Sequence, residues 1–184
     1  MITKLNITGF KGFAQLELPK LSRITLLGGR NNVGKTSLLE ALFMFHDRLN
    51  PQMILRQFAW RGIGAIAFDP DSMWAPVFYN YDIHKKIVIS AVVDGNEEKM
   101  TIVFNPHYSP SSIQANSIKP GTKPMQIRTD QKPEPSFALD IVYDSSEMKN
   151  QTVHLLMGLE GLGVHVEKVS MIKRRSSFLG ASVQ

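Results

Sequence analysis

The feature that most constrains this chain is a glycine-rich octet near its start, GRNNVGKT at residues 29–36. It fits the pattern G-x-x-x-x-G-K-[S/T] at every fixed position. The glycines let the backbone wrap tightly, so successive N–H groups turn inward and form a nest for anions. In such a loop, Lys35 reaches the outer phosphates of a nucleotide and the Thr36 hydroxyl holds Mg²⁺. The predicted nucleotide-binding residues here are Gly29, Arg30, Asn31, Asn32, Val33, Gly34, Lys35, Thr36 and Ser37.

The residues on either side of the octet fit this prediction. Residues 24–27 form an apolar, β-branched run that predicts a buried strand. Residues 38–45 repeat apolar side chains at helical spacing. Strand, loop and helix would then follow one another, and bound phosphates would lie at the N-terminus of the helix.

Composition restricts the other possibilities. The chain has 184 residues, enough for one full domain or two small ones, and it contains no cysteine, which excludes disulfides and thiolate zinc sites. It shows neither a secretory signal nor an apolar run of roughly 20 residues, so we expect a cytoplasmic protein outside the membrane. A net charge of +5 permits contact with nucleic acid without requiring it. The basic cluster at residues 173–175 is more typical of a surface strand than of a nucleic-acid contact.

Most of the remaining chain predicts β-structure. Residues 2–8 and 13–18 alternate around the turn at 9–12, which predicts a hairpin, and Asp94-Gly95-Asn96 predicts a second between strands at 87–93 and 100–104. A proline-rich loop spans 105–135. Further strands are expected at 137–143, 152–157, 164–169 and 170–173, and the aromatic stretch 73–79 is expected in the core.

These elements predict an α/β fold with one strand–loop–helix unit and a mostly antiparallel β lobe. We divide it at residue 50, with the hairpin, loop strand and helix in 1–50 and the β lobe in 51–184. A doubly wound domain is not expected, because strand and helix do not alternate along the chain.

The rest of a hydrolytic site is harder to find. Hydrolysis needs an acidic group for the metal and a polar group that orients water. Asp69 and Asp144 each follow an apolar run, but a solvent-facing carboxylate at a strand end is the more ordinary interpretation. His154 and His165 would face each other across a hairpin, where we expect a paired surface site. The catalytic residues therefore stay unassigned.

The first 49 residues resemble the start of ABC-type ATPase heads, which include RecF, the SMC proteins and the OLD-like ATPases. The likeness is carried by KLNITGFKGF at 4–13, ITLL at 24–27, the glycine loop, and SLLEAL at 37–42. The GGRNN form of the loop is similar to small OLD-like ATPases of bacterial anti-phage defence, among them the ATPase subunits of PARIS-type systems. This resemblance implies ATP and Mg²⁺ as ligands, and it implies that Lys11 approaches the phosphates.

The resemblance also implies partners. Such heads work in pairs, so a second ATPase head would complete the site, and OLD-like ATPases of defence systems act with a TOPRIM-type nuclease effector. The signature, the metal-binding Asp with its catalytic Glu, and the switch His lie in the C-terminal half of such heads and are absent here. We therefore expect an ATPase that is inactive as this segment alone. Gln184 is at best a weak counterpart of the glutamine that senses the γ-phosphate.

Three functions remain open from the sequence. The first is an ATP-binding half-head that controls a partner effector, and the second is a RecF-like DNA-repair head that clamps DNA. The third is an interaction module whose fold a nucleotide merely stabilises. Salt-dependent binding to DNA would distinguish the second from the first.

Overall fold

A computed structural model describes residues 1–48, 50, 52–62, 70–108, 136–149, 151–158, 161–166 and 170–171. A seven-stranded sheet dominates this part of the chain, and every neighbouring pair of its strands is antiparallel. In spatial order the strands are β2 (Phe13–Leu18), β1 (Ile2–Phe10), β3 (Ile87–Val93), β4 (Asn96–Tyr108), β5 (Ser136–Asp144), β7 (Gln151–Gly158) and β8 (Gly161–Val166). Two short strands, β6 (Met148–Lys149) and β9 (Ser170–Met171), pair separately. The antiparallel lobe predicted from the sequence is confirmed.

The turns form where the sequence predicts them. Phe10 pairs with Phe13 across the first turn, so the predicted opening hairpin is confirmed. Asp94 and Gly95 both have positive φ, 49° and 82°, which matches the right-handed twist of the strands they connect. The predicted hairpin of β3 and β4 is thus also confirmed.

The sheet has one buried face. Ile7, Ile89, Met100 and Tyr143 lie side by side across four strands, and all are buried. The next row along, on the opposite face, carries half-buried Val88, Thr101 and Val142. Alternate residues of one strand point to opposite faces, so this alternation fixes which face receives the helices.

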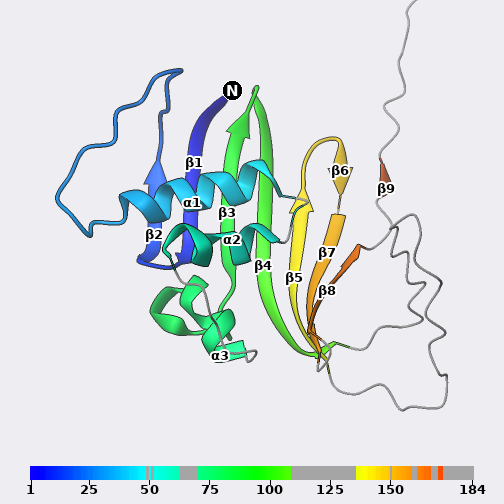
Figure 1. Ribbon diagram of the computed structural model, residues 1–184. Coiled ribbons are helices and arrows are strands. Elements are labelled where there is room, and N and C mark those ends of the chain that lie inside the picture. Colours follow the sequence, from blue (N-terminus) through cyan, green and yellow to red (C-terminus); the bar gives the residue numbers. More distant parts are fainter. Residues whose placement is uncertain are drawn as a thin grey trace, which may run out of the picture.

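Two helices cross the buried face of the sheet (Figure 1). Helix α1 (Lys35–His46) follows the glycine octet as predicted, and α2 (Gln52–Trp60) lies beside it. The sequence analysis did not identify α2. The side of α1 against the sheet buries Ser37, Leu38, Glu40, Ala41, Met44 and Phe45. An acidic side chain, Glu40, therefore lies within an otherwise apolar interface.

The aromatic stretch belongs to the core, as predicted. It forms α3 (Pro70–Met73) and two short 3-10 helices, η1 (Ala75–Val77) and η2 (Tyr79–Tyr81). Trp74 is fully buried and Phe78 is 2% exposed. Phe78 forms a bridge to Phe10, and Val77 accepts a hydrogen bond from the Lys11 backbone at 3.0 Å. This segment consequently fixes the turn of the opening hairpin.

The predicted buried strand at 24–27 is wrong. Those residues form no strand, and Ile24 and Leu26 are 89% and 95% exposed. The hydroxyl of Thr25 instead donates to the Ser22 carbonyl and accepts from the Ser22 amide. A strand needs a neighbouring strand for its backbone groups, and no strand in the described ranges pairs with this segment. The strand–loop–helix unit is therefore present only as loop and helix.

Several predictions lie outside the described residues: most of the proline-rich loop, Asp69, the basic cluster at 173–175 and Gln184. The strand predicted at 164–169 lies earlier, in β8 at 161–166. His154 and His165 do pair across the hairpin of β7 and β8. The expected surface location is wrong for His154, however, because it is 6% exposed and its Nδ1 lies 2.6 Å from Asp140.

Candidate functional site

The glycine loop has positive φ at three positions, a conformation that an anion nest needs. Gly29, Asn32 and Gly34 have φ of 149°, 65° and 95°. Positive φ at these positions turns the backbone against the usual hand, which is what makes N–H groups converge. Helix α1 begins directly afterwards at Lys35, and the Leu38 amide donates to the Gly34 carbonyl at 2.9 Å.

Lys35 lies folded over the loop. Its ammonium donates to the carbonyl oxygens of Gly29 and Arg30 at 2.8 and 2.7 Å. A positive charge is therefore held against the nest, at the helix end where the macrodipole also favours an anion.

The opening hairpin packs directly on the loop. A Cβ at Gly34 would lie 2.7 Å from Cζ of Phe13, closer than side chains approach one another. Glycine is needed at this position twice, once for its φ and once for the ring beside it. The turn residue Lys11 is thereby brought to the same place as the start of α1.

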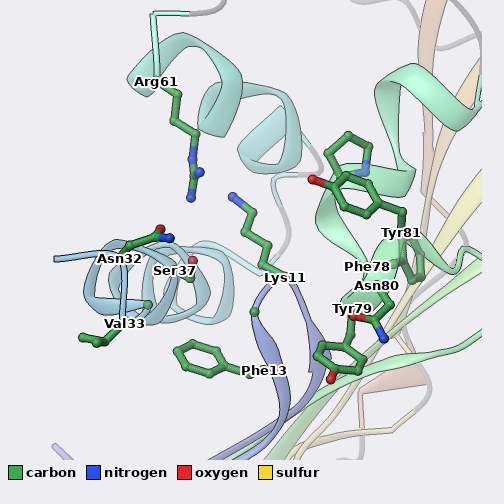
Figure 2. A pocket seen from close by; sticks show the side chains of 13 residues that line it. Lys11, Phe13, Asn32, Val33, Ser37, Arg61, Phe78, Tyr79, Asn80 and Tyr81 are labelled. Atoms are coloured by element: carbon green, nitrogen blue, oxygen red, sulfur yellow. The ribbon is translucent and has the colours of Figure 1, made fainter. Parts of the chain in front are cut away.

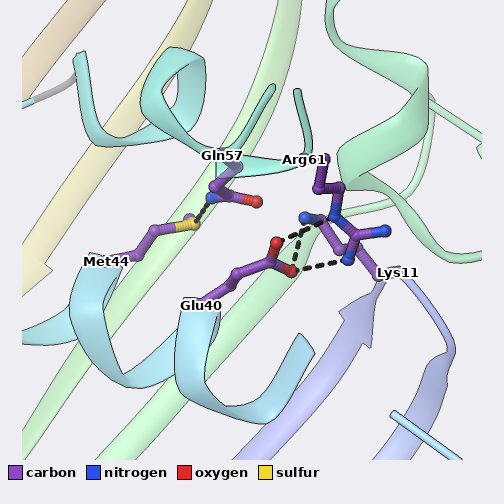
Figure 3. A network of polar contacts seen from close by, with 5 residues as sticks. All are labelled: Lys11, Glu40, Met44, Gln57 and Arg61. Carbon is purple, nitrogen blue, oxygen red and sulfur yellow. Dashed lines mark hydrogen bonds and ion pairs between the residues drawn. The ribbon is translucent and has the colours of Figure 1, made fainter. Parts of the chain in front are cut away.

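An ion network links the hairpin, α1 and α2 (Figure 3). Glu40, with 2% of its side chain exposed, accepts a hydrogen bond from Lys11 Nζ at 2.7 Å. It also accepts two from Arg61, from Nε and Nη2, each at 2.9 Å. The Lys11 side chain is 11% exposed and that of Arg61 is 43% exposed. One carboxylate thus faces two cations, and the network carries a surplus positive charge.

The pKa directions follow from this arrangement. Burial lowers the pKa of Lys11, and the hydrogen bond and charge of Glu40 offset only part of that effect. Burial alone would raise the pKa of Glu40, but the hydrogen bonds and charges of Arg61 and Lys11 together lower it. The Glu40 hydrogen bond raises the pKa of Arg61. The carboxylate is consequently ionised near neutral pH.

A cavity of about 750 Å³ opens between the loop and the network (Figure 2). That volume lies in the range of small-molecule and cofactor sites, roughly 300–1,000 Å³. Its lining combines the hairpin turn, the end of the glycine loop, the end of α2 and the η1–η2 segment: Lys11, Gly12, Phe13, Asn32, Val33, Gly34, Ser37, Arg61, Pro76, Phe78, Tyr79, Asn80 and Tyr81. The combination of the end of the glycine loop, two cations (Lys11 and Arg61) and aromatic walls fits a phosphorylated ligand with a flat ring.

Comparison with known protein families identifies the chain. Residues 1–160 match the AAA ATPase domain, which is most of the 184-residue sequence. This chain belongs to the AAA ATPase domain family. An uncharacterized protein of Methanocaldococcus jannaschii, MJECL10, is 42% identical over 45 residues. That alignment covers 24% of this chain and 20% of the relative, so the chain spans about a fifth of the relative's length. No solved structure matches.

The predicted site residues of this AAA ATPase domain divide into two groups. Lys11, Asn32, Val33, Gly34 and Ser37 line the cavity. Gly29, Arg30, Asn31, Lys35 and Thr36 are not among the lining residues, and Lys35 contacts the loop backbone. Lys11 lines the same cavity as the end of the loop, and its ammonium is bound to Glu40.

The sequence analysis did not identify two parts of the cavity wall, Arg61 and residues 79–81, or the role of Glu40 behind Arg61. Arg61 lies in the turn directly after α2, a helix that the sequence analysis did not predict. Glu40 did carry a usable signal, because a carboxylate on the sheet-facing side of an apolar helix requires buried cationic partners. Asn80 and Tyr81 have φ of 54° and 60°, and no sequence pattern predicts positive φ at these two positions.

Among the residues that the structure describes, no Asp or Glu lines the cavity beside the loop. Asp144 lies at the end of β5 and lines a separate cavity of about 490 Å³ with Lys4, Asn6 and Lys99. Within the described residues, no three His, Asp or Glu side chains form a group that could hold a metal ion. Nor is any described helix long and apolar enough to span a membrane.

Proposed function

We propose that this chain is the ATP-binding part of an OLD/ABC-type ATPase head, which couples ATP binding and hydrolysis to control of a partner effector. The observation that carries the proposal is the glycine nest at the start of α1, opening into a cavity of nucleotide size with Lys11 and Arg61 on its wall. Membership of the AAA ATPase domain family supports the same ligand.

Each residue of the loop has a physical role in this proposal. The backbone of 29–34 supplies N–H groups to the phosphates, and Lys35 leaves the Gly29 and Arg30 carbonyls to contact them. The Thr36 hydroxyl, at the exposed start of α1, is the residue of this loop suited to Mg²⁺. A magnesium ion there would neutralise phosphate charge.

The effector part of the proposal rests on the likeness to OLD-like ATPases of anti-phage defence. ATP binding would close this head on a second one, and that closure would hold or release a TOPRIM-type nuclease. Turnover would then require the acidic residues of the remaining half-site, since no described Asp or Glu lines the cavity beside this loop.

Titration calorimetry with ATP and Mg²⁺ tests the proposal, with Lys35→Ala as the variant. We expect Lys35→Ala to weaken ATP binding about 10- to 100-fold, because one charge-assisted contact contributes about 1.5–3 kcal/mol. Lys4→Ala is the matched control: it removes the same charge from a lysine on β1 that pairs with exposed Glu17. Equal affinities of the Lys35 and Lys4 variants would refute the site.

Turnover and DNA binding separate the alternatives. Binding without hydrolysis is the expected result for this segment. Steady hydrolysis that is lost in Lys35→Ala would show that residues of this chain complete the catalytic site. DNA binding whose affinity falls steeply with salt would favour the RecF-like function.

A further inference from the structure

Arg61 is the one cation of the network with a large exposed fraction. Its guanidinium carries five N–H donors, and the two bonds to Glu40 use one each from Nε and Nη2. Its side chain is 43% exposed and lines the cavity opposite Asn32 and Ser37 (Figure 2). Three donors of the planar guanidinium are thus not used by Glu40, and the side chain that carries them lines the cavity.

The network has two cations and one carboxylate, so an anion would neutralise its remaining positive charge. Glu40 neutralises one of its two cations, and Lys11 takes the more buried position, 11% exposed against 43% for Arg61. The surplus positive charge therefore belongs to Arg61 at the cavity wall. A planar guanidinium with free donors matches the oxygens of a phosphate group better than an ammonium does.

We propose that Arg61 is a phosphate-contacting residue of the nucleotide cavity, held in place by Glu40. This inference rests on the proposed function, since it assigns a further residue to the same site. Glu40 acts as a positioning residue: its two hydrogen bonds fix the guanidinium plane without touching the ligand. Because Arg61 follows α2 directly, phosphate binding would also tie the end of α2 to the glycine loop.

The inference makes a specific claim about the ligand. The phosphate chain alone, without base or ribose, should be enough to contact Arg61. Inorganic pyrophosphate is therefore a probe of the contact that is separate from ATP. Both ligands should lose affinity when the guanidinium is removed.

The experiment compares ATP and pyrophosphate binding to the parent, Arg61→Ala and Arg56→Ala by titration calorimetry. Arg56→Ala is the matched control, because Arg56 is an exposed arginine of α2, the helix that Arg61 follows, and it does not line the cavity. We expect Arg61→Ala to weaken both ligands about 10-fold or more, as for one charge-assisted contact. Arg56→Ala should leave both affinities within about twofold of the parent, a difference of less than 0.5 kcal/mol.

Arg61→Ala removes two of the three hydrogen bonds to Glu40 and leaves Lys11 as its partner, so we expect this variant to lose stability. Affinities are therefore compared at a temperature at which thermal unfolding shows that the parent and every variant are folded. Arg61→Lys provides a second variant that keeps the charge but loses the planar fork, and it should recover only part of the affinity.

Three outcomes would overturn the inference. One is equal affinities in the Arg61 and Arg56 variants, and another is full recovery of affinity in Arg61→Lys. The third is a loss for ATP alone, which would place Arg61 at the base or ribose. A Lys35→Ala variant that loses ATP while Arg61→Ala keeps it would sink this inference and leave the proposed function standing.

Discussion

Residues 24–27 and strand β3 are similar in composition, but only β3 forms a strand with buried side chains. Both are apolar and rich in β-branched side chains. In β3, Ile87 and Ile89 are fully buried between β1 and β4, whereas Ile24 and Leu26 are almost fully exposed. The difference teaches that β-propensity describes how well a side chain fits a pleated surface, and that the surface must first exist. β3 has neighbours on both edges, and within the described residues the segment at 24–27 has none.

The strongest way to break this comparison is to truncate one isoleucine in each place. Ile89→Ala should lower the free energy of unfolding by about 2–5 kcal/mol, because it removes buried methyl groups and leaves a cavity. Ile24→Ala, the same chemical change, should alter it by less than about 0.5 kcal/mol. Urea unfolding followed by circular dichroism measures both.

A large loss in Ile24→Ala would contradict the comparison. It would mean that 24–27 is covered in solution, and the exposed conformation would not be the one that the folded chain adopts. A change in the urea m-value in either variant would instead indicate altered compactness.

The same contrast occurs between neighbours on one helix. Leu39 is 47% exposed while Glu40 is 2% exposed, so α1 turns an apolar side chain to solvent and a carboxylate inward. This inversion of the usual order is explained by Lys11 and Arg61, which bind Glu40 from the hairpin and from the end of α2. Removing one partner of a buried ion pair of this kind strongly destabilises the fold.

Acid should therefore remove the contribution of Glu40 to the stability of the fold. Its pKa is lowered in the folded state, against an ordinary value of 4.5, so its contribution is complete above about pH 4.5 and is lost as the pH falls through the folded pKa. Arg61, whose pKa is raised by its hydrogen bond to Glu40, stays protonated throughout this range. Glu40→Gln should cost about 3 kcal/mol at neutral pH, the scale for removing one partner of a buried pair.

The measurement is the free energy of unfolding of the parent and Glu40→Gln between pH 3 and 7. The difference between the two proteins should shrink as the pH falls below about 4.5, since other carboxylates titrate equally in both. A difference independent of pH would show that the Glu40 charge contributes nothing to stability.

How far the sequence reaches can be judged from these same residues. The hairpins at 9–12 and 94–96 were predictable because glycine and asparagine turn chemistry is local. Loop and helix at 29–46 were predictable because the octet fixes its own backbone. These features depend on few residues close together in the chain.

What failed depended on distant partners. The segment at 24–27 was misread because nothing local reports the absence of a neighbouring strand. Arg61 was missed because its role exists only through Glu40, which lies on another helix. The octet and the apolar spacing after it predicted the helix that begins at Lys35, but the far wall of the cavity, at Tyr79 to Tyr81, is formed by a segment that carries no motif.

The exposed segment rejoins the fold at Gly34, where the loop meets the opening hairpin. Gly34 has φ of 95°, and a Cβ there would meet the Phe13 ring at 2.7 Å. We expect Gly34→Ala to cost about 1–3 kcal/mol, from the strained backbone and the contact together. Gly28→Ala is the matched control, because a Cβ at Gly28 meets nothing within 4 Å, and it should change stability by less than about 0.5 kcal/mol.

A double-mutant cycle with Phe13→Ala separates the two causes. If the ring matters, Gly34→Ala should cost less in the Phe13→Ala background, with a coupling of about 0.5–3 kcal/mol. No coupling would leave the φ of Gly34 as the sole reason for glycine, and the hairpin would not anchor the loop. Because a nest must keep its N–H groups convergent to bind an anion, the ATP affinity of the single variants should follow the same order as their stability. Substitutions at residues 24–28 would then be tolerated, whereas the function of the loop would depend on Gly34, where the hairpin packs against it.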